Sequence, residues 1–187
     1  MARRSPGVQS VCPVTRPLPP APPAPVVAAP LPEREFRNAL GRFATGVAVV
    51  TALAPDGAKV GLTISSFNSA SLTPPLVLWS LMKNAASMPV FQTASHYVVN
   101  VLGAQHIELA MQFSRKGADR WADVAYHTGA CGVPVLGGAI ATFECASRHL
   151  YDAGDHVVLV GEVVHCTHQP GAPLLYHGGQ FYTEQLL

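Results

Sequence analysis

The sequence predicts a mainly β protein, a small antiparallel barrel with two or three flanking helices. About seven apolar segments of strand length, rich in β-branched residues, are separated by turn signals such as Pro55-Asp56-Gly57. Few helical segments stand between consecutive strands, which argues against the parallel sheet of a βαβ protein. The run 157–160 is apolar at every position, so we expect both of its faces to be buried, in the centre of the sheet or in an interface.

The first part of the predicted domain contains one helix and a β-hairpin. Pro32 can open a helix, and the two glutamates that follow it lie in the first turn, where acidic side chains are favoured. Apolar residues at helical spacing continue to Ala44, and Gly46 ends the helix. Two β-branched segments, 47–53 and 60–64, then form the arms of the hairpin.

The remaining elements are strands and short helices. A loop rich in serine and threonine follows the hairpin and closes at Pro74-Pro75, and residues 117–138 are expected to form a glycine-rich loop. The pattern predicts strands at 76–82, 97–102, 139–150, 156–168, 174–176 and 180–183, and helices at 85–93 and 106–116.

The prolines divide the chain into two parts. Ten of the 17 prolines lie in residues 1–32, together with three arginines and no acidic residue. Removing these arginines from the 12 basic residues leaves nine, against 11 acidic residues, in 33–187. We therefore expect a disordered Pro/Ala-rich tail over 1–32 and a single domain over 33–187. Prolines interrupt any apolar signal-peptide core, so the tail does not resemble a secretion signal.

Composition excludes several classes of protein. The net charge of +1 leaves no electrostatic signature of a nucleic-acid or membrane partner, and no apolar stretch approaches the ~20 residues that span a bilayer. Four cysteines without a C-x-x-C pair favour reduced thiols and a cytoplasmic location. Only 12% of the residues are charged, about half the usual share, so some apolar surface should be buried in an oligomer.

The segment 63–73 is the strongest candidate for a binding loop. It carries six hydroxyls and one amide in eleven residues, directly after a predicted strand. Hydroxyls and free backbone N–H groups can bind a phosphate or a polyol without formal charge. A polar loop that only connects two strands is the alternative interpretation of the same residues.

Two single residues add to this candidate site. Lys83 ends a predicted buried strand and could hold an anionic ligand, although a solvated lysine would occur in the same place. His156 follows a Gly154-Asp155 turn and opens the most apolar strand, where an imidazole could donate a proton near neutral pH. An exposed turn histidine is the alternative.

The sequence lacks the residue patterns that other common catalytic and binding sites require. His165, Cys166 and His168 could suggest a metal, but 165 lies on the opposite face of a strand from the other two, so we predict no metal site. The sequence contains no G-x-S-x-G, no G-x-G-x-x-G and no P-loop. A nucleotide ligand, if there is one, would not bind a Rossmann cradle.

These segments occur together in an order that resembles the flavin reductase family, the small reductase components of two-component flavin monooxygenases. The opening motif is the run 36–47, FRNALGRFATGV, and the family's flavin-binding loop resembles 61–69, GLTISSFNS. Further blocks match at 71–78, 99–102, 154–156 and 161–163, so the resemblance runs from about Phe36 to Tyr182. Residues 1–32 lie outside it.

The resemblance implies a fold and an activity. The fold would be an FMN-binding split barrel, an antiparallel barrel of Greek-key type, assembled as a homodimer. The activity would be reduction of FMN or FAD by NADH or NADPH, with reduced flavin diffusing to a partner monooxygenase. Hydride transfer between these two cofactors is intrinsic to their chemistry, so the protein would mainly stack and orient two rings. The absence of a paired-carboxylate site or a catalytic triad agrees with that requirement.

The resemblance also assigns site residues. His156 would lie where the nicotinamide meets the flavin, as the catalytic residue. Contacts along the flavin ring edge, ribityl chain and phosphate would come from Thr63, Ser65, Ser66 and Ser69, completed by Ser80, Leu81, Lys83 and Asn84, with Phe113 near the ring. The chain departs from the family pattern at Asp119-Arg120-Trp121, where relatives more often carry Arg-Phe, which leaves the role of Arg120 open.

Two other readings share the fold. A split-barrel protein that binds flavin or haem without catalysis, as a carrier or sensor, could use the same loop. An oxidase of the pyridoxamine-phosphate type is a third reading. The few basic residues near the loop argue against this oxidase, because its substrate adds a second phosphate.

Overall fold

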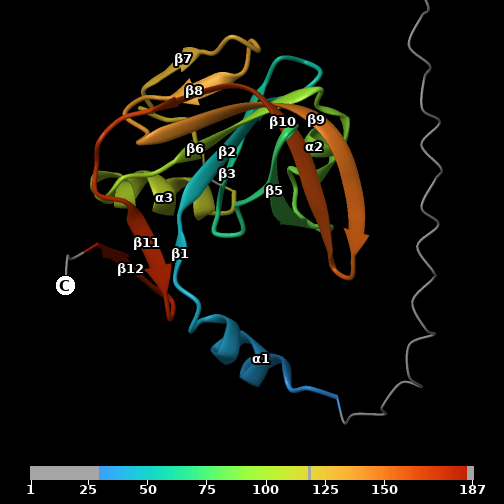
Figure 1. Cartoon of the computed structure of the whole chain (residues 1–187), viewed down its shortest axis with the longest axis vertical. Coiled ribbons are helices and arrows are strands. Elements are labelled where there is room, and N and C mark those ends of the chain that lie inside the picture. Colours follow the sequence, from blue (N-terminus) through green and yellow to red (C-terminus); the bar gives the residue numbers. More distant parts are fainter. Residues whose placement is uncertain (1–29, 118, 185–187) are drawn as a thin grey trace, which may run out of the picture. The chain divides into compact units, whose positions relative to one another are not determined.

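A seven-stranded antiparallel sheet forms the centre of the computed structural model, which describes residues 30–117 and 119–184 (Figure 1). The expected tail falls almost wholly on residues 1–29, which lie outside the described residues, so it stays a prediction. Every pair of neighbouring strands is antiparallel. In order across the sheet the strands are β3 (Lys59–Ile64), β2 (Ala48–Leu53), β6 (His96–Val101), β9 (Ala141–Ala153), β10 (His156–His168), β5 (Pro75–Met82) and β4 (Asn68–Leu72).

The connection between β3 and β4 makes this sheet a barrel. These strands form the two edges of the sheet, yet only residues 65–67 join them. Three linking residues span at most about 15 Å, whereas the edges of a flat sheet of seven strands lie about 29 Å apart. The sheet must therefore curl until its edges approach each other, and it leaves an open seam between β3 and β4.

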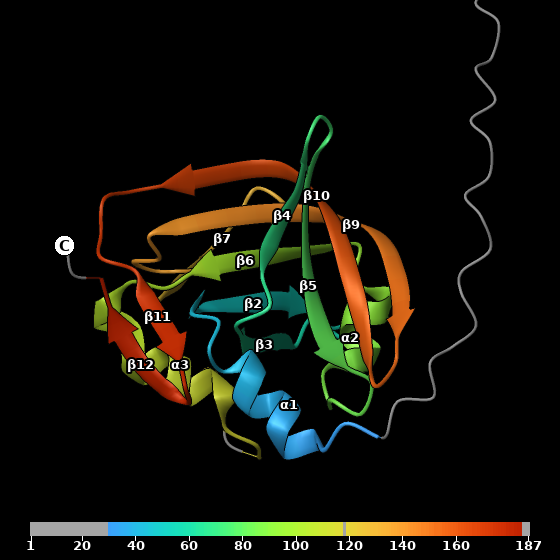
Figure 2. The same ribbon diagram turned by 60° about the horizontal axis from the view of Figure 1, so that its bottom comes forward.

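Shorter elements surround the barrel (Figures 1 and 2). The helices are α1 (Glu33–Leu40), α2 (Met88–Thr93) and α3 (Ile107–Ser114), with a 3₁₀ turn η1 (Ala104–His106) before α3. A three-stranded sheet contains β1 (Thr45–Gly46), β11 (Leu174–His177) and β12 (Gln180–Thr183), and a separate hairpin contains β7 (Tyr126–Thr128) and β8 (Pro134–Leu136). No helix among the described residues is both long enough and apolar enough to cross a bilayer.

The strand β2 is apolar on both faces because it separates two hydrophobic cores. Val50 faces the barrel interior, where Trp79 and Tyr97 are almost fully buried. Val49 faces the other way and packs in a second cluster with Phe113 of α3. The period-2 geometry of a strand sends successive side chains to opposite faces, so α3 can cover one face while the barrel closes over the other.

The barrel core also contains a buried thiol. Cys145 is fully buried in the same cluster as Trp79 and Tyr97. Burial, with smaller contributions from Cys131 and Glu144, raises the pKa of the Cys145 thiol to about 12. The thiol therefore stays protonated at neutral pH and packs as a small apolar group.

Buried polar groups attach the β7–β8 hairpin to the barrel. The amide of Asn100 accepts a hydrogen bond from Leu136 N at 2.9 Å and donates to the carbonyl oxygen of Val49 at 3.0 Å. The hydroxyl of Thr51 donates to the carbonyl oxygen of Pro134 at 2.6 Å. Because these groups are buried, each needs such a partner, and the partners hold the hairpin in one position.

The expected mainly β fold is confirmed, with three differences in detail. The first helix ends at Leu40 instead of continuing to Ala44, because Gly41 closes it and the next two amides bond three residues back in tighter turns. Residues 68–72 form β4 rather than loop. The strand is almost wholly exposed, so it lacks apolar alternation. The stretch 117–138 contains the β7–β8 hairpin, whose strands of three residues are too short to show a period.

Candidate functional site

A cavity of about 650 Å³ opens beside the seam of the barrel. It lies between the ends of β3 and β5 with the segments that follow them, the first residue of β10, and the C-terminal end of α3 with its following loop. Its volume is in the range of small-molecule sites. The lining residues are Leu62, Thr63, Ile64, Ser65, Ser66, Ser80, Leu81, Met82, Asn84, Ala85, Ala86, Ser87, Phe113, Ser114, Lys116, Gly117, Arg120 and His156.

Two hydroxyls hold the walls of the cavity together. The Ser66 hydroxyl accepts a hydrogen bond from Ser80 N at 3.0 Å and lies 3.3 Å from the Ser80 carbonyl oxygen, to which it donates. Ser66 therefore joins the seam loop, the connection 65–67 between β3 and β4, to β5. The Thr63 hydroxyl donates to the carbonyl oxygen of Ala110 at 2.6 Å, which joins β3 to α3.

A glycine makes room for the aromatic part of the cavity. A Cβ atom on Gly61 would meet the ring of Phe113 at 2.5 Å and that of Trp121 at 3.4 Å, so only glycine fits without a shift of these rings. The two rings contact each other edge to face, with centroids 5.2 Å apart. Arg120 closes this side, because its Nη1 donates to the Gly61 carbonyl oxygen at 2.9 Å.

His156 stands at the other side of the cavity, where it begins β10 opposite Met82 of β5. Its Nδ1 lies 2.7 Å from the carboxylate of Asp155. The hydrogen bond and the charge of the imidazole hold the pKa of Asp155 below its ordinary value. Since Asp155 can only accept at neutral pH, Nδ1 carries the hydrogen, and Nε2 is left to interact with a ligand.

The cavity brings together eight of the ten residues that the sequence singled out: Thr63, Ser65, Ser66, Ser80, Leu81, Asn84, Phe113 and His156. The other two lie outside its lining. Ser69 is an exposed residue of β4, opposite Val77. The ammonium of Lys83 points to Asp152, 2.8 Å from its carboxylate, although the backbone of Lys83 is tied to the Asp155 carbonyl. The ligand contacts of all ten stay predictions.

Sequence reasoning missed most of the α3 side of the cavity, where it predicted only Phe113. Ser114, Lys116, Gly117 and Arg120 line it from the end of α3 and the loop behind it. This loop has neither apolar periodicity nor a binding motif, so only the departure at Asp119-Arg120-Trp121 drew attention to it. Ser87 was also missed, although it follows Asn84 by three residues in the same segment.

The charge of the cavity lining is positive. Lys116 and Arg120 carry permanent charges, and no aspartate or glutamate is among the described residues that line it. No group of three or more potential metal ligands occurs in the part of the chain that the structure describes. The cavity therefore suits a ligand with an apolar ring, several hydrogen-bonding groups and a negative charge.

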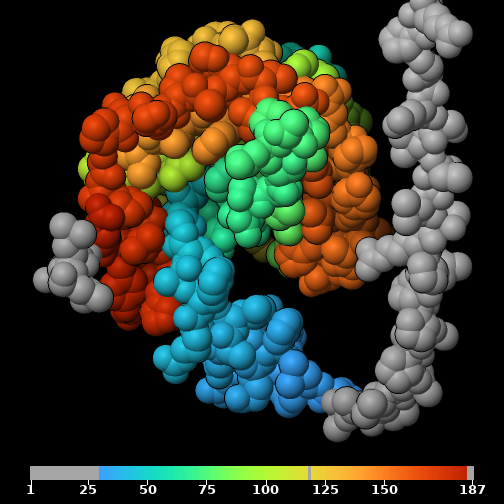
Figure 3. Space-filling model, in the orientation of Figure 1, coloured from blue at the N-terminus to red at the C-terminus, as the bar shows by residue number. Residues whose placement is uncertain are grey.

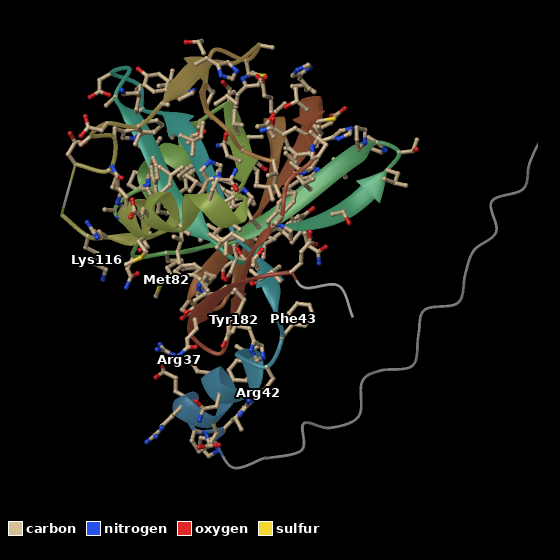
Figure 4. The ribbon with its side chains drawn as sticks, turned by 90° about the vertical axis from the view of Figure 1, so that its left-hand side faces the viewer. Arg37, Arg42, Phe43, Met82, Lys116 and Tyr182 are labelled. Carbon is tan, nitrogen blue, oxygen red and sulfur yellow. The ribbon has the colours of Figure 1, made fainter. Side chains whose placement is uncertain are left out.

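A second cavity, of about 970 Å³, lies on the other side of the seam loop. It shares Ser65 and Ser66 with the first and extends between α1 and the β11–β12 hairpin. Figure 4 shows Arg37, Arg42 and Phe43, which line this cavity from α1 and the residues that follow it. Thr45, which also lines this cavity, has a buried hydroxyl without a partner among the described residues.

Solved flavin reductases of the split-barrel class share this fold. One is the NADH:FAD oxidoreductase SgcE6 of Streptomyces globisporus C-1027, solved in complex with NAD and FAD fragments. It aligns with a TM-score of 0.76 and 36% sequence identity, over 80% of this chain and 92% of that chain.

The chain itself belongs to the flavin reductase family, since the family model for the flavin reductase like domain matches residues 40–185. The FMN reductase (NADH) SmoA of Agrobacterium fabrum is 47% identical over 148 residues, which is 79% of this chain and 84% of that protein. The reductase component of a Rhodococcus opacus 4-nitrophenol 4-monooxygenase/4-nitrocatechol 2-monooxygenase is 41% identical, over 81% of each chain.

The close approach at Gly61 gives a first testable prediction. Gly61→Ala should lower the free energy of unfolding by about 1–3 kcal/mol, because the new methyl group overpacks the rings of Phe113 and Trp121. Urea denaturation followed by tryptophan fluorescence measures the change. Gly46→Ala is the matched control, since a Cβ there meets nothing within 4 Å. Equal stability of the two variants would contradict the packing argument.

Proposed function

We propose that this protein is an NAD(P)H-dependent flavin reductase, which transfers hydride from a reduced nicotinamide to FMN or FAD. The cavity beside the barrel seam is the observation that supports the proposal. It combines a hydroxyl wall (Thr63, Ser65, Ser66 and Ser80), the aromatic ring of Phe113 and the positive charges of Lys116 and Arg120, in a member of the flavin reductase family. Two relatives are named as enzymes of this activity, an FMN reductase (NADH) and an NADH:FAD oxidoreductase.

The residues present fit a flavin. When both cofactors are bound, reduced nicotinamide supplies the hydride and the flavin N5 accepts it. The Ser65 hydroxyl and the polar segment from Ser80 to Asn84 offer hydrogen bonds to the ring edge, ribityl chain and phosphate, while Phe113 limits the cavity behind the ring. The hydroxyls of Thr63 and Ser66 donate within the protein, so we assign to them the role of acceptors toward the flavin. We assign to His156 the contact with the nicotinamide side, through its free Nε2. The protein thereby orients two rings and excludes water between them.

We further propose that the reduced flavin leaves for a partner monooxygenase. Several relatives are named as reductase components, including that of the Rhodococcus opacus 4-nitrophenol enzyme and that of a trigonelline monooxygenase from Acinetobacter baylyi. We also propose a cytoplasmic location, which agrees with the free thiols of Cys131, Cys145 and Cys166.

The helix α1 supports a homodimer. None of its residues is buried, and an isolated helix of eight residues is unstable in water. Phe36 is 50% exposed, Leu40 56% and Phe43, three residues beyond the helix, 75%. The helix is set apart from the main sheet (Figures 1 and 3). We propose that a second copy of the chain covers the apolar face of α1. Such an interface would also explain the low share of charged residues in the sequence.

The activity is tested by steady-state kinetics with the purified protein. NADH or NADPH should be oxidised only when FMN, FAD or riboflavin is present, with electrons appearing in the flavin under anaerobic conditions. The flavin absorbance then bleaches in proportion to the nicotinamide consumed. If flavin binds but is reduced with neither donor, the protein is a carrier or sensor of the same fold.

The role of His156 is tested separately from flavin binding. His156→Ala should lower kcat by about tenfold or more, with less than a threefold change in the Kd of the flavin, because the imidazole contacts the donor side. Fluorescence quenching of the flavin measures the Kd. His149→Ala is the control, since His149 is an exposed histidine of β9 outside the cavity lining. Unchanged kcat in His156→Ala removes the assigned role.

The dimer is tested at the same apolar face. Phe43→Glu should shift the protein from dimer to monomer, because a charge replaces the most exposed aromatic side chain of this face. Size-exclusion chromatography with light scattering measures the mass. Met111→Glu, at a 44% exposed methionine of α3, is the control and should remain dimeric. A monomeric wild-type protein would contradict the proposal.

A further inference from the structure

We propose that Lys116 and Arg120 bind the pyrophosphate of the nicotinamide dinucleotide at the mouth of the cavity. The inference rests on the proposed function and deepens it. It assigns binding of the hydride donor to two residues that were not among the flavin contacts expected from the sequence. The two side chains lie on the α3 side of the cavity, whereas most of the hydroxyls that line it come from the ends of β3 and β5 and from residues 65–67 after β3.

These two residues hold the available positive charge of the site. Nearby lysines are engaged elsewhere: Lys83 forms an ion pair with Asp152, and the ammonium of Lys59 lies 4.3 Å from the ring centroid of Tyr126. No carboxylate belongs to the described lining, so nothing there neutralises Lys116 or Arg120. A ligand with two phosphate charges would be attracted to this edge.

The guanidinium of Arg120 is held in place before any ligand arrives. Its Nε donates to the Arg115 carbonyl oxygen at 2.8 Å, and its Nη1 donates to the Gly61 carbonyl oxygen at 2.9 Å. Gln112 secures the same segment, because its Nε2 donates to the carbonyl oxygens of Arg120 and Ala122 at 3.2 and 2.8 Å. A guanidinium has five N–H groups, so three remain for an anion.

The position of Lys116 favours the nicotinamide donor over the flavin. Lys116 lines the cavity from the loop that follows α3, whereas Thr63 and Ser80 line it from β3 and β5. The flavin phosphate has a separate set of polar groups in the segment from Ser80 to Ser87. Two stacked cofactors would thus direct their phosphates to different edges.

The experiment compares a donor with phosphates and a donor without them. NADH carries the pyrophosphate, and N-benzyl-1,4-dihydronicotinamide delivers the same hydride without it. Lys116→Ala should lower kcat/KM for NADH by about tenfold through KM, and Lys116→Glu should lower it further. Both variants should leave kcat/KM for the benzyl donor within twofold of wild type. The side chain of Lys116 is exposed, so these variants should fold.

Controls separate this inference from its alternatives. Arg148→Ala removes a cation that pairs with Glu162 outside the cavity and should affect neither donor. Equal losses with both donors, no loss with NADH, or a raised KM for FMN but not for riboflavin would each overturn the inference. The last result would show that Lys116 binds the flavin phosphate instead. Absence of flavin reduction by wild-type protein with either donor would instead refute the proposed function.

Discussion

The three-residue connection between β3 and β4 is the constraint on which the rest of the structure depends. A chain that must pass from one edge of a seven-stranded sheet to the other in residues 65–67 forces that sheet to close. Closure brings the polar ends of β3 and β5 together, and Ser66 then joins them through Ser80. Phe67 in the same connection packs against Phe143 at a centroid distance of 5.3 Å, so the loop is anchored on the core as well. The cavity is a consequence of this closure.

The second requirement is a strand that can be buried on both faces. The side chains of β2 alternate between the barrel interior and the cluster that contains α3. This packing brings Phe113 against Gly61 and holds the end of α3 beside the open seam. One side of the cavity is therefore built from strand ends and hydroxyls, and the other from a helix end, the ring of Phe113 and two cations. The difference in chemistry between the two sides follows from the different elements that supply them.

The sequence predicted the parts of this arrangement that have a local signature. Apolar β-branched runs located the long strands, and the dense hydroxyls of 63–73 located the seam loop, because both patterns lie within one short stretch of sequence. Exposed β4 has no apolar alternation, so its pairing with β5 could not be predicted from its own residues. Lys83 shows the limit for side chains: its position after a strand was correct, but a partner 69 residues away, Asp152, decides where its ammonium points. Arg120 likewise lines the cavity because of carbonyls at Gly61 and Arg115 that no spacing rule connects to it.

The distribution of charge around the cavity bears on how a reductase of this kind would exchange its flavin. Neutral hydroxyls bind a ring and a ribityl chain through hydrogen bonds that are each worth only about 1 kcal/mol net, because water competes for the same groups. A buried cation against the flavin would bind the anionic form of the reduced ring more strongly than the oxidised ring, and would slow its release. Here the charges of the lining are on the half-buried Arg120 and the exposed Lys116, and Arg120 is fixed to backbone carbonyls. Such an arrangement attracts anionic cofactors without holding the reduced ring, which is what transfer of reduced flavin to a separate monooxygenase requires.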